Sequence, residues 1–377
     1  MKPSREFQVF VKPVGSLCNM SCSYCYYLNK KDLFPVGAPV RMPDLLLEEY
    51  IVQHIEASTE TDIFFTWHGG EPTLAGLDMF KRIVSLQKQY KPEGRQIFNG
   101  IQTNGTLLND TWCGFLSQER FHVGISLDGP AYLHDQFRAG PSGESTFEKT
   151  IESFRMLKDY GISPEILCVV NAINVGKGLE VYRFIRELGA SFITFLPLVE
   201  RSIQTNNKVT EKSVPANMFG DFLCTVFDEW KNDIGQIKVQ IFEEALRSAF
   251  NQDHTLCIFK KTCGTIPVVE HDGSFYACDH FVDEDHYFGN IMETSLTELL
   301  DHPRQKEFGS AKLESLPACC IECEVRDMCN GECPKNRFMV SRDGEPGLNY
   351  LCEGYRKFFN YIKPFIQEVS SAWKAGK

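Results

Sequence analysis

The sequence predicts an α/β protein in which a partial (β/α)6 barrel is followed by a small cysteine-rich domain. Strand-like and helix-like stretches alternate six times up to about Asp233, polar and glycine-rich motifs follow the strands, and cysteines crowd the rest of the chain. Such alternation implies parallel strands covered by helices. The two further units that would close an eight-stranded barrel are not found. We expect residues 1–235 to form the barrel and residues 236–377 the second domain.

The elements follow in order from their apolar patterns. Short apolar runs that end near glycine, asparagine or proline predict strands at Phe7–Pro13, Asp62–Trp67, Gln96–Thr103, Val123–Leu127, Ile166–Val170 and Phe192–Leu196. Helical spacing predicts a helix opened by Pro43 and others near Leu77–Tyr90, Asp110–Glu119, Phe147–Leu157, Leu179–Leu188 and Ala216–Lys231. Ligands bind at the carboxyl ends of parallel strands, so the motifs there are candidate sites. After Asp233 we expect short loops with little core of their own.

Composition limits the class of protein. The 377 residues are 43% hydrophobic, as in an ordinary globular protein. No run of about 18 apolar residues could span a membrane, and the N-terminus has no apolar signal core, so we expect a cytoplasmic protein. The net charge of −11 disfavours nucleic acid as a partner. Fifteen cysteines in that compartment favour metal binding or catalysis over disulfides.

Three cysteines near the N-terminus, Cys18, Cys22 and Cys25, have the spacing C-x3-C-x2-C. Three thiolates are too few to close a four-coordinate site, but they can hold a cubane iron–sulfur cluster and leave one iron open. An aromatic residue, Tyr24, precedes the last cysteine. A zinc knuckle or a pair of disulfides is the alternative, and the lack of a nearby fourth ligand makes zinc awkward.

This stretch resembles the cluster motif of radical S-adenosylmethionine (SAM) enzymes. The resemblance implies that the open iron binds the amino and carboxylate groups of SAM, which one electron cleaves to methionine and a 5′-deoxyadenosyl radical. The turn Gly69-Gly70-Glu71-Pro72 resembles the family element that binds the amino group of SAM, and its glycines allow close backbone approach. The alternative for this motif is an ordinary turn after a strand.

The same resemblance places Tyr24 of the cysteine motif at the cofactor and makes three more residues SAM contacts. Ser126 would bond the ribose, Arg138 would pair with the carboxylate, and Val199 would pack on the adenine. A satisfied polar residue, a solvated charge and a core valine are the respective alternatives, and the sequence leaves them open.

Eight cysteines of the second half have a spacing that resembles the SPASM domain of peptide-modifying radical SAM enzymes. Eight thiolates can ligate two four-iron clusters. The resemblance gives one cluster Cys257, Cys263, Cys278 and Cys333, and gives the other Cys320, Cys323, Cys329 and Cys352. Two structural zinc sites are the alternative, and Cys319 could replace its neighbour Cys320. The remaining cysteines, Cys113, Cys168 and Cys224, are expected to be small buried apolar residues.

Over essentially its whole length the chain resembles anaerobic sulfatase-maturating enzymes. The stretches that indicate this narrower family are Cys18–Lys30, His68–Pro72, Gln102–Gly105, Ser126–Gly129 and Cys278–Phe281. The resemblance implies radical oxidation of a Cys or Ser, in a Cys/Ser-x-Pro-x-Arg-type segment of a newly made sulfatase, to Cα-formylglycine by hydrogen abstraction from Cβ. It makes Asp279 the general base, a role that needs a carboxylate within hydrogen-bond reach of the substrate. The alternative for Asp279 is a loop aspartate bonded to its own backbone. A flavodoxin or ferredoxin would supply electrons to three [4Fe–4S] clusters.

Other functions remain as alternatives at this point. Another SPASM maturase could make thioether or carbon–carbon crosslinks in a ribosomal peptide, although the first strand begins near Phe7 and leaves no room for an N-terminal recognition domain. An iron–sulfur electron carrier and a zinc-stabilised scaffold are alternatives of other classes. The preference for Cys or Ser, the sulfatase, the reductant and the oligomeric state are not determined by the sequence.

Overall fold

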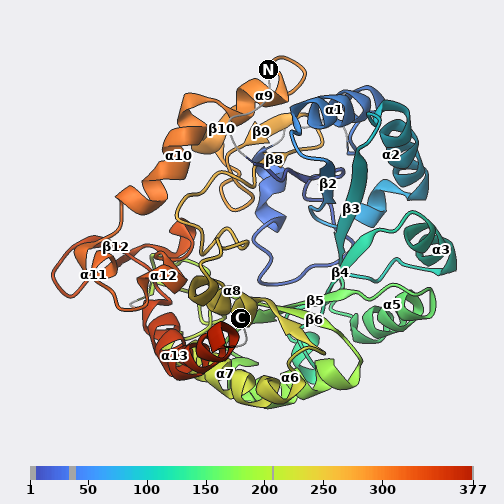
Figure 1. Cartoon of the computed structure of the whole chain (residues 1–377). Coiled ribbons are helices and arrows are strands. Elements are labelled where there is room, and N and C mark those ends of the chain that lie inside the picture. Colours follow the sequence, from blue (N-terminus) through green and yellow to red (C-terminus); the bar gives the residue numbers. More distant parts are fainter. Residues whose placement is uncertain (1–5, 34–39, 206–207, 376–377) are drawn as a thin grey trace. The chain divides into compact units, whose positions relative to one another are not determined.

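The protein is described here by a computed structural model, which covers residues 6–33, 40–205 and 208–375. The chain forms two compact units, and Figure 1 shows their elements coloured along the sequence. The first unit comprises Met1–Ser126, Asp135–Pro164 and Gly264–Gly309, and the second comprises Leu127–His134, Glu165–Cys263 and Ser310–Lys377. These units do not follow the chain order, because a late segment joins the N-terminal residues. The domain boundary near Gly235 remains a prediction from cysteine density.

The sheet of the first unit combines early and late strands. Its strand order is β10-β9-β8-β1-β2-β3-β4, with bounds β1 Phe10–Val11, β2 Asp62–Trp67, β3 Gln96–Thr103, β4 His122–Ser126, β8 Val268–Val269, β9 Ser274–Tyr276 and β10 Tyr287–Asn290. β1 pairs in parallel with both β2 and β8, while β9 is antiparallel to both of its neighbours, β8 and β10. The pairing of β8 with β1 brings the segment that carries Asp279 into the first unit, which sequence spacing did not indicate.

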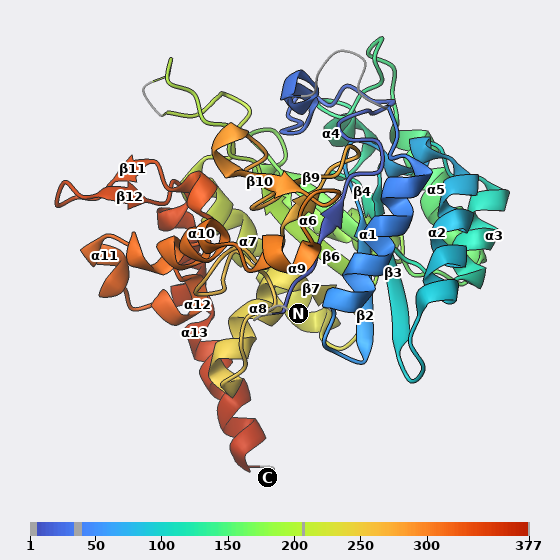
Figure 2. The same cartoon turned by 90° about the horizontal axis from the view of Figure 1, so that it is seen from above.

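Amphipathic helices cover the parallel part of this sheet, with bounds α1 Asp44–Ala57, α2 Leu77–Tyr90, α3 Asp110–Gln118, α5 Phe147–Asp159 and α9 Leu296–Leu300. α1, α2 and α3 lie on one side of β2–β4 in both views (Figure 1 and Figure 2). Asn109 caps α3 by accepting from the backbone of Trp112, and Ser295 forms a capping box with Glu298 at α9. Trp67 of β2 packs against Phe80 of α2, so this helix is fixed by its apolar face.

The second unit has its own parallel strands and long helices. The bounds are β5 Glu165–Val170, β6 Phe192–Pro197, β7 Lys238–Val239, α6 Gly178–Glu187, α7 Ala216–Trp230, α8 Gln240–Arg247 and α13 Cys352–Ala375. β6 pairs with both β5 and β7. α7 packs closely on α13, since a Cβ at Gly354 would lie 2.1 Å from the Ala216 carbonyl oxygen. The expectation of short loops with little core after Asp233 is wrong: α13 alone has 24 residues and buries Phe358 and Phe359.

The remaining elements are short. They are the helices α4 Ala131–His134, α10 Pro303–Glu314, α11 Ala318–Ile321 and α12 Arg326–Cys329, the hairpin β11 Met339–Val340 with β12 Pro346–Leu348, and 3-10 turns at Leu28–Leu33, Pro72–Ala75, Val175–Lys177, Lys231–Asp233, Ser248–Phe250, Glu284–His286 and Pro334–Asn336. Across residues 6–33, 40–205 and 208–375, none of the helices is long and apolar enough to cross a membrane.

The predicted elements of the barrel region are present. The bounds of β2, α2 and β3 are those expected, and the ends of the other elements differ by one or two residues. The exception is the first strand, expected at Phe7–Pro13 and assigned only to Phe10–Val11. Its backbone bonding is nevertheless longer, because Gln8, Phe10 and Lys12 donate in turn to carbonyls of 265, 267 and 269.

Candidate functional site

The three N-terminal cysteines lie together on the loop between β1 and α1. Burial raises the pKa of the Cys18 thiol to about 11, and the neighbouring thiolates of Cys22 and Cys25 act in the same direction. Two N–H groups face the Cys18 sulfur, from the Met20 backbone at 3.4 Å and from Asn104 at 3.8 Å. Grouped thiols with N–H donors suit a cluster held by three cysteines, because such donors stabilise the sulfur charge.

The segment after α4 braces this loop. Ser21 and Ser23 donate backbone hydrogen bonds to the carbonyls of Ala139 and Phe137, each at 2.9 Å. Between these contacts, the buried guanidinium of Arg138 donates to the hydroxyl of the buried Tyr24 at 2.9 Å. The structure thus brings together two predicted SAM contacts, Tyr24 and Arg138, and gives the aromatic residue of the cysteine motif a positioning role.

The turn after β2 packs against the backbone that leads to Cys18. Gly70 donates to the Gly15 carbonyl at 2.9 Å, and Glu71 donates to the Leu17 carbonyl at 2.8 Å. A Cβ at Gly70 would lie 2.1 Å from the Leu17 oxygen, and Gly69 has φ +127°. Glycine is therefore required here because two backbone segments approach each other closely. The sequence alone explains the same glycines by close approach of the backbone to a ligand.

The carboxylate of Glu71 is fully buried and ties the ends of β2 and β3 together. It accepts from the Thr73 backbone (3.1 Å) and hydroxyl (2.6 Å), the Thr103 hydroxyl (2.7 Å) and the Asn104 backbone (2.8 Å). Burial raises its pKa, and these hydrogen bonds oppose the rise. These bonds give Glu71 the role of holding the strand ends together, and its contact with SAM remains a prediction.

The two other predicted SAM contacts lie in different units, each at the end of its own strand. Ser126 closes β4 and accepts from Gln102 of β3 at 3.1 Å. Val199 follows β6 of the second unit and is half-buried. Both positions fit the rule that ligands gather at the carboxyl ends of parallel strands. Their contacts with SAM stay predictions.

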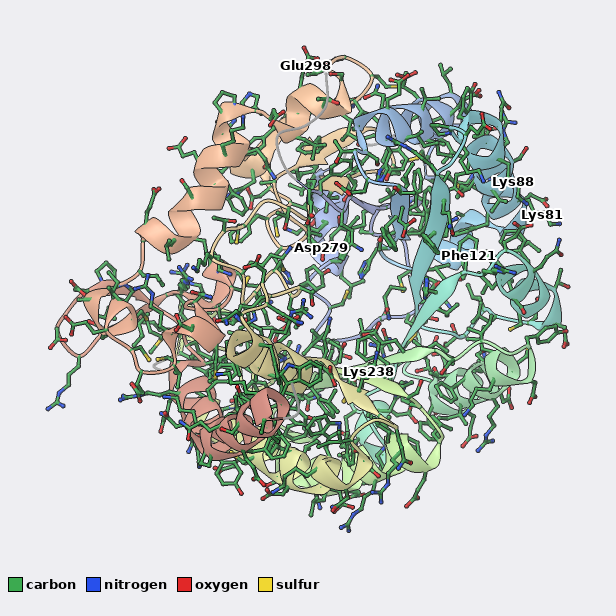
Figure 3. The ribbon with its side chains drawn as sticks, viewed as in Figure 1. Lys81, Lys88, Phe121, Lys238, Asp279 and Glu298 are labelled. Carbon is green, nitrogen blue, oxygen red and sulfur yellow. The ribbon has the colours of Figure 1, made fainter. Side chains whose placement is uncertain are left out.

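Asp279 lies inside the first unit, whereas Lys81 and Lys88 of α2 lie at the surface of that unit (Figure 3). Its carboxylate accepts one hydrogen bond from the ammonium of Lys12 and another from the hydroxyl of Tyr26. Burial by itself would raise the pKa of Asp279, but the charge of Lys12 holds that pKa well below its usual range. The residue is an ionised buried carboxylate, unlike the self-bonded loop aspartate of the alternative interpretation.

Lys12 is fully buried, and its side chain contacts residues of three motifs: Asp279 after Cys278, His68 before the glycine turn, and Tyr27 after the cysteine triad. Its Nζ also lies 3.1 Å from Nδ1 of His68 and 4.5 Å from the ring centroid of Tyr27. The backbone N–H of Gly69 points at the same Nδ1 at 2.8 Å, so this nitrogen accepts hydrogen bonds and the imidazole proton sits on Nε2. Burial, and then Lys12, lowers the pKa of His68 to about 3, which keeps the ring neutral.

Sequence reasoning missed Lys12, Tyr26 and a second buried pair, in which the hydroxyl of Tyr27 donates to Glu270. The available signal was a lysine within the apolar run Phe7–Pro13, because a charge on a buried strand needs a partner. The spacing of the motifs along the sequence does not indicate which residue pairs with Lys12.

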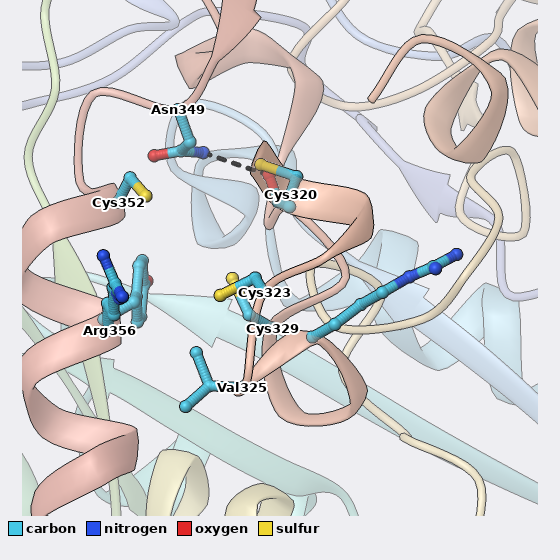
Figure 4. Close-up of a pocket in the computed structure, with 10 residues that line it drawn as sticks. Cys320, Cys323, Val325, Cys329, Asn349, Cys352 and Arg356 are labelled. Carbon is cyan, nitrogen blue, oxygen red and sulfur yellow. Dashed lines mark hydrogen bonds between the residues drawn. The ribbon is translucent and has the colours of Figure 1, made fainter. Parts of the chain in front are cut away.

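Four of the SPASM cysteines line one pocket of the second unit. Cys352 faces it from the start of α13, and Cys320, Cys323 and Cys329 face it from the α11–α12 segment (Figure 4). Burial raises the pKa of the Cys320 and Cys329 thiols to about 12 and that of Cys352 to about 11. Cys319 is exposed and is not among the lining residues. The structure therefore groups the four cysteines that the resemblance assigned to one cluster, with Cys320 as the member of the adjacent pair.

Three of the other four SPASM cysteines also lie in the second unit. Cys257, Cys263 and Cys333 all interact electrostatically with the buried Lys312. The fourth, Cys278, belongs to the first unit and immediately precedes Asp279. Of the cysteines expected to be apolar residues, Cys113 and Cys168 are buried, and Cys224 is half-buried.

Comparison with known proteins supplies the family. Residues 13–181 match the model of the radical SAM superfamily, and residues 257–324 match that of an iron–sulfur cluster-binding domain, SPASM. The chain is 41% identical to a serine-type anaerobic sulfatase-maturating enzyme of Bacteroides thetaiotaomicron, covering 96% of this chain and 91% of the relative. It is 31% identical to a cysteine-type enzyme of Clostridium perfringens, covering 96% and 98%.

Solved structures agree. The native enzyme anSMEcpe with bound AdoMet has a TM-score of 0.86 and 31% identity, covering 97% of this chain and 99% of that one. These matches confirm the predicted fold class and the cofactors, [4Fe–4S] clusters and SAM; two family-matched regions are consistent with three clusters. They also confirm the expected radical oxidation that generates formylglycine. This chain belongs to the anaerobic sulfatase-maturating enzymes.

Proposed function

We propose that Asp279 is the general base in the oxidation of a sulfatase serine or cysteine to Cα-formylglycine. The observation that carries the proposal is the buried, ionised carboxylate of Asp279, held by Lys12 and Tyr26 in the same unit as the N-terminal cysteine loop. A base must be unprotonated at the moment of transfer and within reach of the substrate proton. The ion pair with Lys12 provides the first condition.

The balance of the reaction defines what the base must do. Bound SAM and its cluster supply the 5′-deoxyadenosyl radical that takes one hydrogen atom from Cβ. A serine side chain must then lose one electron and its hydroxyl proton to become the aldehyde. A cysteine loses the thiol proton and one electron to give a thioaldehyde, which water hydrolyses to the aldehyde with release of hydrogen sulfide. In both cases Asp279 accepts the heteroatom proton.

The neighbours of Asp279 set the conditions for that transfer. Lys12 and Tyr26 both donate to the carboxylate, and a low pKa makes a carboxylate a weak base. Proton uptake therefore requires the bond from Lys12 or Tyr26 to give way. Tyr26 holds its own proton firmly, since burial and the charge of Asp279 raise its pKa well above the ordinary value.

We propose the cofactor ligands on the same grounds as in the sequence, and grouping within one unit supports the N-terminal triad and the set that includes Cys320. Cys18, Cys22 and Cys25 hold the SAM-binding cluster. One auxiliary cluster takes Cys320, Cys323, Cys329 and Cys352, and the other takes Cys257, Cys263, Cys278 and Cys333. The proposed SAM contacts are Tyr24, Gly69, Gly70, Glu71, Ser126, Arg138 and Val199, and residues 1–235 and 236–377 are the proposed functional domains.

The substrate is proposed to be a sulfatase polypeptide with serine at the modified position. The serine-type relative is 41% identical, against 31% for the cysteine-type relative. Solved structures described as anSMEcpe with AdoMet and the Cp18Cys or Kp18Cys peptide show that a related chain takes peptides. Electrons would come from a flavodoxin or ferredoxin. Fifteen free thiols suit a reducing cytoplasm.

The test is anaerobic incubation of the reconstituted protein with SAM, a reductant and two matched peptides, one with serine and one with cysteine at the target position. Mass spectrometry measures the aldehyde, and chromatography measures 5′-deoxyadenosine. We expect aldehyde from both peptides and faster turnover of serine. Deoxyadenosine without aldehyde from either peptide would contradict the proposed substrate, and faster cysteine turnover would contradict the preference.

The cluster assignment is tested by comparing Cys320→Ala with the matched control Cys319→Ala. We expect the first variant to lose the iron of one cluster, about a third of the total, because a lining thiolate is gone. The control keeps its iron. If Cys319→Ala lost the iron and Cys320→Ala kept it, Cys319 would be the cluster ligand in place of Cys320.

A further inference from the structure

Lys312 of α10 is a buried cation that donates hydrogen bonds to backbone oxygens. It is only 1% exposed, and its Nζ donates to the carbonyls of Cys257 at 2.8 Å and Ile258 at 2.7 Å. Within the described residues, no carboxylate oxygen lies within 4.0 Å of this Nζ. A buried ammonium without a counter-charge is costly, so the position calls for a negative partner.

Arg337 is a second cation in the same region. Its guanidinium donates to the carbonyls of Gly331 (2.8 Å), Asn330 (2.8 Å) and Glu332 (3.1 Å), and also to the carbonyl of Lys312. These bonds wrap the backbone between Cys329 and Cys333 around a positive charge. Within the described residues, Arg337 likewise has no carboxylate at salt-bridge distance.

Cysteine thiols surround the two cations. Lys312 contacts the Cys257 backbone directly and interacts electrostatically with the thiols of Cys263, Cys257 and Cys333. Arg337 interacts with Cys263 but also with Cys320 and Cys329 of the other proposed set, so Lys312 is the cation that distinguishes the two sets. One buried carboxylate, Glu332, opposes the cations, but it is held by Asn336 at 3.1 Å and Asn349 at 2.6 Å. Two fixed cations against one carboxylate leave the region positive apart from the thiolates.

The pocket of the other auxiliary cluster is different. Two arginines line it. Arg356 is exposed and pairs with Glu324 at 2.8 Å, so its charge is largely cancelled and screened by solvent. The half-buried Arg326 donates to the Ile321 carbonyl at 3.2 Å. The two groups of cysteines thus have unequal electrostatic surroundings, although each is expected to hold the same kind of cluster.

We propose that Lys312 and Arg337 are positioning residues that act as counter-charges to the iron–sulfur cluster of Cys257, Cys263 and Cys333 and raise its reduction potential above that of the other auxiliary cluster. The inference rests on the ligand sets proposed above. Uptake of one electron adds one negative charge to the cluster, and a nearby fixed positive charge stabilises the reduced form, most strongly in a low-dielectric interior. This cluster is then the better acceptor of the electron that the substrate radical loses, together with its heteroatom proton, on becoming the aldehyde.

The test compares Lys312→Gln, which keeps hydrogen-bond donors but removes the charge, with Lys312→Arg, which keeps the charge. Lys261→Met removes an exposed lysine of the same cysteine-bearing loop and is the matched control. Each holoprotein is assayed for iron and sulfide and titrated anaerobically with dithionite while the reduced clusters are followed by electron paramagnetic resonance. The signal of the N-terminal cluster is identified by its change on addition of SAM.

We expect Lys312→Gln to lower the equilibrium constant for one-electron reduction of one auxiliary cluster about tenfold, which lowers its reduction potential by about 59 mV. Lys312→Arg and Lys261→Met should leave this potential unchanged. Loss of auxiliary iron from Lys312→Gln alone also supports a counter-charge, because the arginine variant keeps the charge. An unchanged potential with full iron overturns the proposal, and so does equal damage in the glutamine and arginine variants. No sulfatase peptide is present in this titration, so failure of the proposed substrate or base would be seen separately, in the aldehyde assay.

Discussion

Lys12 and Asp279, separated by 267 positions in the sequence, form an ion pair in which the lysine side chain is fully buried. Such a pair is costly to desolvate but still more costly to break, because removal of one partner leaves the other charge buried and alone. The pair therefore links the proposed chemistry of Asp279 to the stability of the first unit, and experiments on either residue must measure both.

Replacement Asp279→Asn is expected to separate the two half-reactions. SAM cleavage continues, because the cysteine loop is intact, while formylglycine falls at least a hundredfold, in line with the usual contribution of a general base. The measurement is deoxyadenosine and aldehyde from the same incubation. Asp285→Asn, an exposed carboxylate on the same segment, is the control. Normal aldehyde yield in Asp279→Asn would remove Asp279 from the mechanism.

A double-mutant cycle tests the ion pair. We expect Asp279→Asn and Lys12→Met each to lower the free energy of unfolding by about 3–5 kcal/mol, since each leaves a buried charge without its partner. The double variant should lose much less than the sum of the two. Denaturant unfolding of the four proteins under anaerobic conditions gives the coupling energy. Additive losses would show that the two charges do not interact.

The same pair predicts a pH dependence. The pKa of Asp279 is lowered in the folded protein, so its stabilising contribution is present above the unfolded value of about 3.9 and is lost as pH falls below that value. We expect the unfolding free energy of the wild type to fall more steeply below about pH 4 than that of the Lys12→Met/Asp279→Asn protein. Parallel curves for the two proteins would argue against an ionised Asp279.

Tyr24 is expected to position Arg138 for SAM. Tyr24→Phe removes the hydroxyl that accepts from the buried guanidinium at 2.9 Å, and hydrogen bonds to charged groups contribute about 1.5–3 kcal/mol. We expect the KM for SAM to rise roughly tenfold or more with a smaller change in kcat. Steady-state deoxyadenosine formation provides both constants. Tyr132→Phe, an exposed tyrosine, serves as the comparison, and equal effects in both would contradict a role for Tyr24.

The N-terminal triad is tested by Cys22→Ala. We expect SAM cleavage to be abolished and about a third of the iron to be lost, because two thiolates cannot retain the open cluster, while auxiliary iron remains. Cys224→Ala, at a half-buried cysteine of α7 outside the proposed ligand sets, should keep both properties. Continued deoxyadenosine production by Cys22→Ala would rule out the assigned site.

The sequence by itself determined the elements of the barrel region and the kind of chemistry. β2, α2 and β3 follow from apolar periodicity, and the cysteine spacings name a cluster with an open iron because ligand number is a local, countable property. The prediction from sequence missed α13, although its buried Tyr355, Phe358, Phe359, Ile362 and Ile366 recur at helical spacing. What the sequence does not show is that this face packs on α7, where Gly354 closely contacts Ala216.

The tertiary structure alone decided which distant residues meet. Lys12 meets Asp279 only in the folded chain. The Leu17 carbonyl lies so close to Gly70 that a side chain there is excluded. Cys320 lines the pocket, whereas Cys319 does not. The physical reason is that periodicity and spacing record interactions a few residues apart. A buried charge shows in the sequence that it needs a partner, but only the packing of strands from both ends of the chain shows which residue that partner is.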